Sequence, residues 1–198
     1  MLQSSLRAPV TKIITPICRG LLKIGLTANS VTFIGTLASI FTSIILVPSG
    51  HLLAASLMLT AFVLFDLLDG TMARLSPQGA NKWGALLDST LDRISDGALM
   101  GSLLWYLHKN NQTLELVVLV NLLLSFLISY IKAKAESLDL ECNGGFAERT
   151  ERLIILLLSI GLAGLGIPHI LFAGMWFLCL ASLITLIQRF RIVYRAAL

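Results

Sequence analysis

The chain has 198 residues, of which 56% are hydrophobic and 13% are charged, with a formal net charge of +4. A soluble domain carries about 25% charged residues, so this chain lacks the charge needed to cover a water-exposed surface. The composition therefore excludes a separate soluble domain and favours an all-α integral membrane protein, a single domain over residues 1–198 without a nucleic-acid partner.

The first segment, residues 1–24, mixes apolar residues at helical spacing with Arg7, Lys12, Arg19 and Lys23. This pattern predicts a basic amphipathic helix that lies on an anionic membrane surface, and a frayed basic leader is the alternative. The basic residues also interrupt the apolar run that a cleavable signal peptide would need.

Six apolar segments follow, each suited to a transmembrane helix. Pro48-Ser49-Gly50 and the stretch 164–168 mark turns between them, and the short fifth segment is expected to begin earlier, within ERTER. The predicted six-helix bundle, over 31–194, has spans near 31–48, 52–74, 84–107, 114–136, 152–166 and 169–194.

Lysine and arginine residues set the predicted orientation. On this assignment 14 of the 15 basic residues lie in the N-terminal arm, the second and fourth connections, the C-terminal tail or the adjoining helix ends, and Lys109 alone lies on the other side. Because basic residues concentrate in cytoplasmic segments, both termini are expected in the cytoplasm.

Acidic residues cluster near the cytoplasmic ends of the second and third spans. Asp66 and Asp69 are three residues apart, and Asp88 and Asp92 are four apart, so each pair shares one face of its helix. A short connection between the spans would bring both pairs together. Four ionised carboxylates repel one another unless cations lie between them, and hard divalent ions such as Mg²⁺ or Mn²⁺ prefer oxygen ligands.

The residues around these aspartates are suited to a phosphate ligand. Gly70 and Gly84 lack side chains, which would let a phosphate approach the backbone, and Arg74 offers a fork of donors. The alternative is that the aspartates only pair with neighbouring basic residues at the membrane interface. Asp96, one turn beyond Asp92, could join the pocket or pair locally with Arg93 or Lys82.

The combined pattern Asp66-x2-Asp69-Gly70-x2-Ala73-Arg74-x9-Gly84-x3-Asp88-x3-Asp92 resembles the signature of the CDP-alcohol phosphotransferases. The gap between Arg74 and Gly84 is one residue longer than is usual in that family, which puts contacts of the loop containing Ser76-Pro77 in doubt. The resemblance covers essentially the whole chain, including six spans and the amphipathic arm.

The resemblance implies specific roles for the matching residues. Asp66, Asp69 and Asp88 would hold one metal ion, and Asp66, Asp88 and Asp92 a second; Mg²⁺ is the expected cofactor, with Mn²⁺ possible. Asp92 would also be the general base that takes a proton from the acceptor hydroxyl. The implied CDP-lipid-binding residues are Asn29, Ser30, Val31, Thr32, Gly70, Arg74 and, in the altered loop, Asn81.

Basic residues on the cytoplasmic faces of the last three spans would suit an acceptor that carries its own phosphate. They could instead be only the positive charges expected on the cytoplasmic side. These segments resemble those of the actinobacterial phosphatidylinositol phosphate synthases, which implies inositol phosphate as acceptor. The implied phosphate-binding residues are Lys132, Arg152 and Arg189, with Lys134 and Arg191 as second choices.

Three functional hypotheses follow. The favoured one is transfer of a phosphatidyl group from CDP-diacylglycerol to inositol phosphate, with release of CMP. The second is the same chemistry with glycerol phosphate or free inositol as acceptor. The third is a divalent-cation carrier, which the aliphatic outer parts of the last three spans disfavour. The family resemblance further implies a homodimer in the cell membrane.

Overall fold

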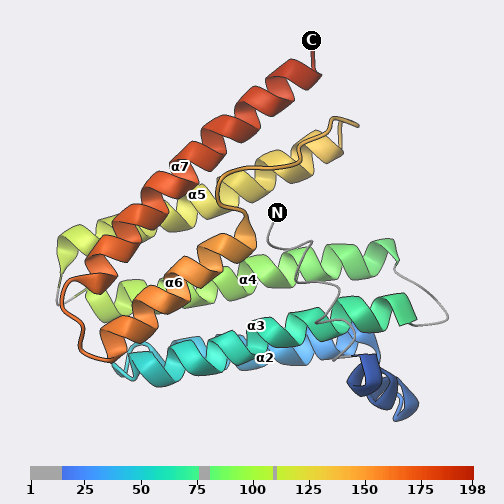
Figure 1. Ribbon diagram of the computed structural model, residues 1–198, viewed down its shortest axis with the longest axis horizontal. Helices are drawn as coiled ribbons and strands as arrows, with labels where there is room; N and C mark the ends of the chain where they lie inside the picture. Colours follow the sequence, from blue (N-terminus) through green and yellow to red (C-terminus); the bar gives the residue numbers. More distant parts are fainter. Residues whose placement is uncertain (1–14, 76–80, 109–110) are drawn as a thin grey trace. The chain divides into compact units, whose positions relative to one another are not determined.

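A computed structural model describes residues 15–75, 81–108 and 111–198, with the backbone alone at 64–67 and 69. All regular elements of the described residues are α-helices (Figure 1), as predicted. The predicted spans lie within three residues of the helix ends, and the fifth helix does begin inside ERTER. The helices are α2 (Ala28–Leu46), α3 (Leu52–Leu75), α4 (Lys82–Leu107), α5 (Gln112–Glu136), α6 (Arg149–Gly164) and α7 (Ile170–Ala196).

Three of the described helices, α2, α5 and α7, are long and apolar enough to cross a membrane. The described side chains of α3 add a shorter apolar stretch, Leu52–Val63, which ends where the side chains at 64–67 lie outside the described part. Charged residues interrupt α4, and α6 has 16 residues and begins with RTER. Length and composition therefore support a membrane protein, whereas the count of six spans is left as a prediction.

Two predicted turns coincide with glycines in the left-handed region. Gly50 has φ +79° and follows α2, and Gly166 has φ +82° and follows α6. Glycine adopts this conformation without the steric cost that a Cβ would impose. The short connections at 47–51 and 165–169 depend on it.

The chain forms two compact units, Met1–Thr42 with Met58–Ser95 (unit 1) and Ser43–Leu57 with Asp96–Leu198 (unit 2). In unit 1, residues 15–23 are helical, while the rest of the predicted interfacial helix, 1–14, lies outside the described residues. Cys18 of this helix packs with Leu68 and Met72 of α3, and its thiol donates to the Leu68 carbonyl at 3.5 Å. Leu68 is about 200° around the helix from Asp66, so the arm packs on the side of α3 away from that position.

Unit 2 brings α7 against both α5 and α6. Asn121 of α5 donates from Nδ2 to the Met175 carbonyl of α7 at 3.0 Å. Gly161 of α6 lies against Ser56, whose hydroxyl donates to the Leu157 carbonyl at 2.7 Å. Small residues and side-chain hydrogen bonds of this kind are typical of helix packing in membranes.

Candidate active site

The two aspartate pairs occupy α3 and α4 of unit 1. Asp66 and Asp69 have helical backbone three residues apart; their side chains lie outside the described part. On α4, Asp88 is exposed and Asp92 is partly buried, one helical turn away. Because they are four residues apart, their carboxylates lie on one face of α4, and carboxylate oxygens are the ligands that hard divalent ions prefer. These two residues therefore fit the metal ions that the sequence predicts.

No three ligand-type residues form a metal-holding group among the side chains that the structure describes. The side chains of Asp66 and Asp69, which supply half of the predicted ligands, lie outside the described part. Asp92 also forms an ion pair with the adjacent Arg93, at 3.5 Å from Oδ2 to Nη2.

Two predicted nucleotide-binding asparagines meet at Gly84. Asn81 precedes α4 and accepts a hydrogen bond from the Gly84 N–H at 2.7 Å, which makes it the N-cap of this helix. A Cβ on Gly84 would lie 3.1 Å from Asn29 Oδ1 and 3.3 Å from Asn81 Oδ1. The missing side chain of Gly84 thus allows an amide from α2 and an amide from the start of α4 to converge on one point.

The other predicted residues of the stretch Asn29–Thr32 lie in the first turn of α2 and make different contacts. The Thr27 hydroxyl accepts from the Ser30 N–H at 3.2 Å and caps the helix. Val31 packs against the Cys18 cluster, while the Thr32 hydroxyl is buried and donates to the Ala28 carbonyl at 3.0 Å. Of the four residues Asn29–Thr32, Asn29 is the one that the structure places at Gly84.

Gly70 and Arg74 lie on the turns of α3 that follow the first aspartate pair. Gly70 is exposed, and a Cβ on it would meet no described atom within 4 Å. Arg74 is exposed and donates from Nη2 to the Thr71 hydroxyl at 3.1 Å. Since arginine has five N–H donors, this bond orients the guanidinium and leaves donors for a phosphate.

In unit 2 the two buried arginines of the predicted acceptor site contact backbone carbonyls. Arg152 donates from Nη1 to Ala147 at 2.9 Å, and Arg189 donates from Nη1 to Ile128 at 2.7 Å and from Nε to Gly144 at 3.3 Å. The two side chains therefore hold the α5–α6 loop. The other predicted residues are less buried: Lys132 pairs with Glu136 at 3.9 Å, and Lys134 and Arg191 are exposed.

Further contacts fix the same loop, and sequence reasoning did not find them. The Ala147 N–H donates to the Thr185 hydroxyl at 2.9 Å, and the Phe146 N–H donates to Gln188 Oε1 at 2.7 Å. Gly145 has φ +138°, and a Cβ there would lie 2.7 Å from Thr185 Cγ2. The Gly144-Gly145 pair was the available signal, since adjacent glycines favour backbone conformations that other residues avoid.

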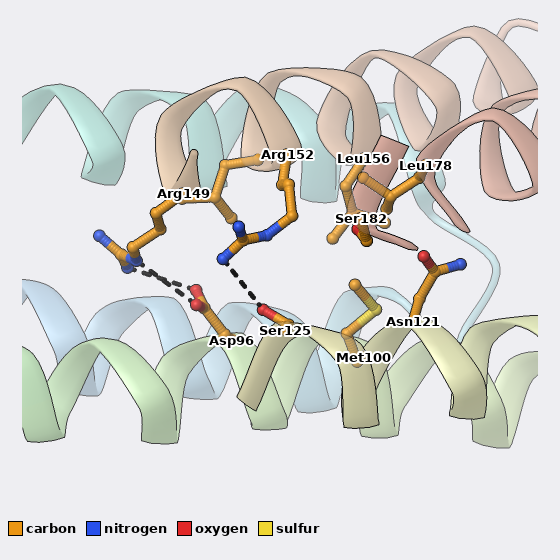
Figure 2. Close-up of a pocket in the computed structure, with 10 residues that line it drawn as sticks. Asp96, Met100, Asn121, Ser125, Arg149, Arg152, Leu156, Leu178 and Ser182 are labelled. Atoms are coloured by element: carbon orange, nitrogen blue, oxygen red, sulfur yellow. Dashed lines mark hydrogen bonds and ion pairs between the residues drawn. The ribbon is translucent and has the colours of Figure 1, made fainter. Parts of the chain in front are cut away.

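Asp96 has a partner that local spacing did not predict. Its carboxylate accepts from Arg149 of α6, at 3.3 Å from Nη2 and 3.4 Å from Nε (Figure 2). Asp96 itself is 8% exposed. The buried Asp96 carboxylate is therefore paired with a guanidinium whose side chain is 27% exposed, close to the buried Arg152. The local partners considered from the sequence, Lys82 and Arg93, do not include this contact between α4 and α6.

The arrangement of these residues defines a class of protein. Carboxylates on two helices, two converging amides and an exposed arginine suit a diphosphate nucleotide with metal ions, and the apolar helices suit a lipid substrate. The class is a membrane enzyme that acts on a nucleotide-linked lipid. The sequence profile of the CDP-alcohol phosphatidyltransferase family matches residues 25–190, and the chain belongs to this family.

Relatives with assigned names are similar over almost their whole length. The phosphatidylinositol phosphate synthase of Mycobacterium tuberculosis is 47% identical over 193 residues, which cover 95% of this chain and 88% of the relative. The protein of the same name from Corynebacterium glutamicum is 38% identical over 186 residues, covering 92% and 84%. A third, from Streptomyces avermitilis, is 39% identical over 198 residues, covering 96% and 81%.

Solved structures agree with the fold. The Mycobacterium tuberculosis phosphatidylinositol phosphate synthase with CDP-DAG bound has a TM-score of 0.88 and 46% identity, covering 92% of this chain and 94% of that chain. The same synthase in complex with manganese and citrate has a TM-score of 0.87 and 46% identity, covering 91% and 88%. The helical arrangement described above is therefore that of the family.

Proposed function

We propose that this enzyme transfers the phosphatidyl group of CDP-diacylglycerol to inositol phosphate, forming phosphatidylinositol phosphate and CMP. The convergence of Asn29 and Asn81 at Gly84, on the helix that carries Asp88 and Asp92, carries the nucleotide part of the proposal. The acceptor follows from relatives named phosphatidylinositol phosphate synthase that are up to 47% identical over 95% of the chain.

Two divalent ions, Mg²⁺ or Mn²⁺, are proposed to bind between α3 and α4. Asp66, Asp69 and Asp88 would hold one ion, and Asp66, Asp88 and Asp92 the other. A relative solved in complex with manganese supports this assignment. When bound, such ions neutralise charge that develops on the diphosphate.

The protein's own residues orient the lipid nucleotide and move one proton. Asn29, Asn81 and Arg74 are proposed to bind the CDP portion, with Gly70 leaving space beside α3. The hydroxyl oxygen of the acceptor attacks the β-phosphorus, the bond from that phosphorus to the CMP oxygen breaks, and Asp92 takes the hydroxyl proton. A carboxylate is a weak base, so the proton transfer requires close positioning of the hydroxyl.

The acceptor phosphate is proposed to bind at the basic residues of unit 2. Arg152 and Arg189 are fixed by the carbonyls of the α5–α6 loop, which reduces the entropy lost when they bind an anion. Lys132 completes the proposed set, and the exposed Lys134 and Arg191 would contribute attraction at longer range.

The chain is further proposed to span the cell membrane six times as a homodimer, with the active site and both termini in the cytoplasm. Residues 1–24 would lie on the membrane surface. Arg19, Lys23 and the apolar Ile17 and Ile24 are exposed on the described part of this arm, as an interfacial helix requires.

The test is CMP release by purified protein supplied with CDP-diacylglycerol and Mg²⁺. Inositol phosphate, free inositol, glycerol 3-phosphate and serine are offered in parallel reactions. We expect release above background with inositol phosphate only. Release only with glycerol phosphate would contradict the acceptor assignment, and no release with any acceptor would contradict the proposed chemistry.

A further inference from the structure

Unit 2 contains a pocket that shares Arg152 with the proposed acceptor-phosphate site, while its other lining residues have no role in the proposed reaction. It lies among α4, α5, α6 and α7, and about 20 Å³ inside it can hold the centre of a water molecule. Figure 2 shows charged side chains toward one end and Asn121 toward the other. The residues around it are Asp96, Met100, Asn121, Ser125, Arg149, Arg152, Leu153, Leu156, Leu178 and Ser182.

Two buried polar atoms at this pocket have no hydrogen-bond partner among the described residues: Asn121 Oδ1 and Ser182 Oγ. Each residue is only 1% exposed. The Asn121 amide is held in one orientation, because its Nδ2 donates to both the Val117 and Met175 carbonyls at 3.0 Å. Its oxygen is therefore left as an acceptor that requires a donor.

Leaving these two buried atoms without hydrogen-bond partners has a large free energy cost in a membrane protein. An unsatisfied polar group away from water costs several kcal/mol, and lipid supplies no replacement partner. Asn121 is nine residues into the 25-residue helix α5, and Ser182 is twelve residues into the 27-residue helix α7. Both are therefore far from helix ends, where bulk water would reach them.

The charges around the pocket restrict what can occupy it. At the Asn121 end of the pocket the amide oxygen disfavours an anion, while Arg149 and Arg152 at the other end disfavour a cation or metal ion. An apolar occupant would leave Asn121 Oδ1 and Ser182 Oγ unsatisfied. The fitting ligand is small, neutral and able both to donate and to accept hydrogen bonds.

We propose that this pocket is a hydrated recess in which bound water donates to Asn121 Oδ1, bonds to the Ser182 hydroxyl and extends to the Asp96–Arg149 pair. A cavity needs roughly 10–15 Å³ measured in this way to hold one water molecule, so about 20 Å³ has room for at least one. The water also solvates two charges that would otherwise be costly to bury beside the apolar residues Met100, Leu156 and Leu178. This proposal does not depend on the identity of the acceptor.

Thiol reactivity tests the proposal directly. In a variant with Cys18, Cys142 and Cys179 replaced by alanine, a cysteine is introduced by Ser182→Cys or, as matched control, by Ala181→Cys. Ala181 is equally buried, at 2% exposed, and adjacent in α7, but it does not line the pocket. Methyl methanethiosulfonate reacts with the thiolate, which forms in water and not in a dry interior. We expect modification at least tenfold faster in the Ser182→Cys protein, and equal rates would overturn the proposal.

The melting temperature of the Ser182→Ala variant gives a second test, in which the direction of the change decides between a hydrated and a dry pocket. If water bonds to the Ser182 hydroxyl, the substitution removes that hydroxyl and leaves the water with one hydrogen-bond partner fewer, so the melting temperature falls. If the hydroxyl is dry and unsatisfied, alanine removes an unfavourable buried group, and the melting temperature rises. A rise would overturn the proposal even if the introduced thiol reacts.

Discussion

The Gly84→Ala substitution probes the point where two helices present their amides. A Cβ there would lie 3.1 Å from Asn29 Oδ1 and 3.3 Å from Asn81 Oδ1, closer than the 3.4–4 Å of ordinary contact. Both amides must therefore move by a few tenths of an ångström. The Asn81 amide would also lose part of its 2.7 Å bond to the backbone N–H of residue 84.

The effect on stability should be small because two terms oppose each other. Weakening an N-cap costs up to about 0.5–2 kcal/mol, whereas alanine in place of glycine inside a helix stabilises by about 0.5–1 kcal/mol. Each displaced amide would lose a nucleotide hydrogen bond of about 0.5–1.5 kcal/mol. Two such losses, about 1–3 kcal/mol together, correspond to about 5- to 150-fold in kcat/KM for CDP-diacylglycerol.

The assay is initial-rate CMP release at varied CDP-diacylglycerol, together with thermal unfolding. Gly101→Ala is the control, because Gly101 lies in the same helix and a Cβ there meets no described atom within 4 Å. We expect normal kinetics for Gly101→Ala and a raised KM for CDP-diacylglycerol with Gly84→Ala. Unchanged kinetics for Gly84→Ala in a folded protein would refute a nucleotide site at Asn29 and Asn81.

Three further predictions concern the base, the loop and the metal ions. Asp92→Asn should abolish CMP release while CDP-diacylglycerol binding, measured by calorimetry, persists; near-normal turnover would remove Asp92 as the base. Gly145→Ala should lower stability by about 2–4 kcal/mol in thermal unfolding, since φ is +138° and a Cβ would lie 2.7 Å from Thr185 Cγ2; an unchanged melting temperature would show that the loop adjusts. Chelation with EDTA should stop CMP release until Mg²⁺ or Mn²⁺ is added, and full activity in EDTA would exclude the metal mechanism.

The helices could be predicted closely from the sequence because each is a long apolar run bounded by turn or charged residues. The start of α6 at Arg149 is an example, since the ERTER stretch continues the helical register into the charged region. The turn at Gly50 was equally clear, because Pro48-Ser49-Gly50 is a strong local signal. The number of membrane crossings is harder to establish, because charged residues occupy part of α4 and the start of α6.

The candidate site was predictable where its signal is local. Asp88 and Asp92, or Asn81 and Gly84, are separated by three or four residues, and helical geometry then fixes their relation. The pairing of Asp96 with Arg149 and the bond from Arg189 to Ile128 join residues 53 and 61 positions apart. Local periodicity carries no information about such partners, so these contacts required the fold.

The most direct test of the central claim follows the acceptor phosphate into the lipid. The purified protein is incubated with CDP-diacylglycerol, Mg²⁺ and inositol phosphate that is radiolabelled in its phosphate group. If the acceptor hydroxyl attacks the β-phosphorus, the label enters the lipid fraction in equal amount to the CMP released. CMP release without label in the lipid would contradict transfer to inositol phosphate.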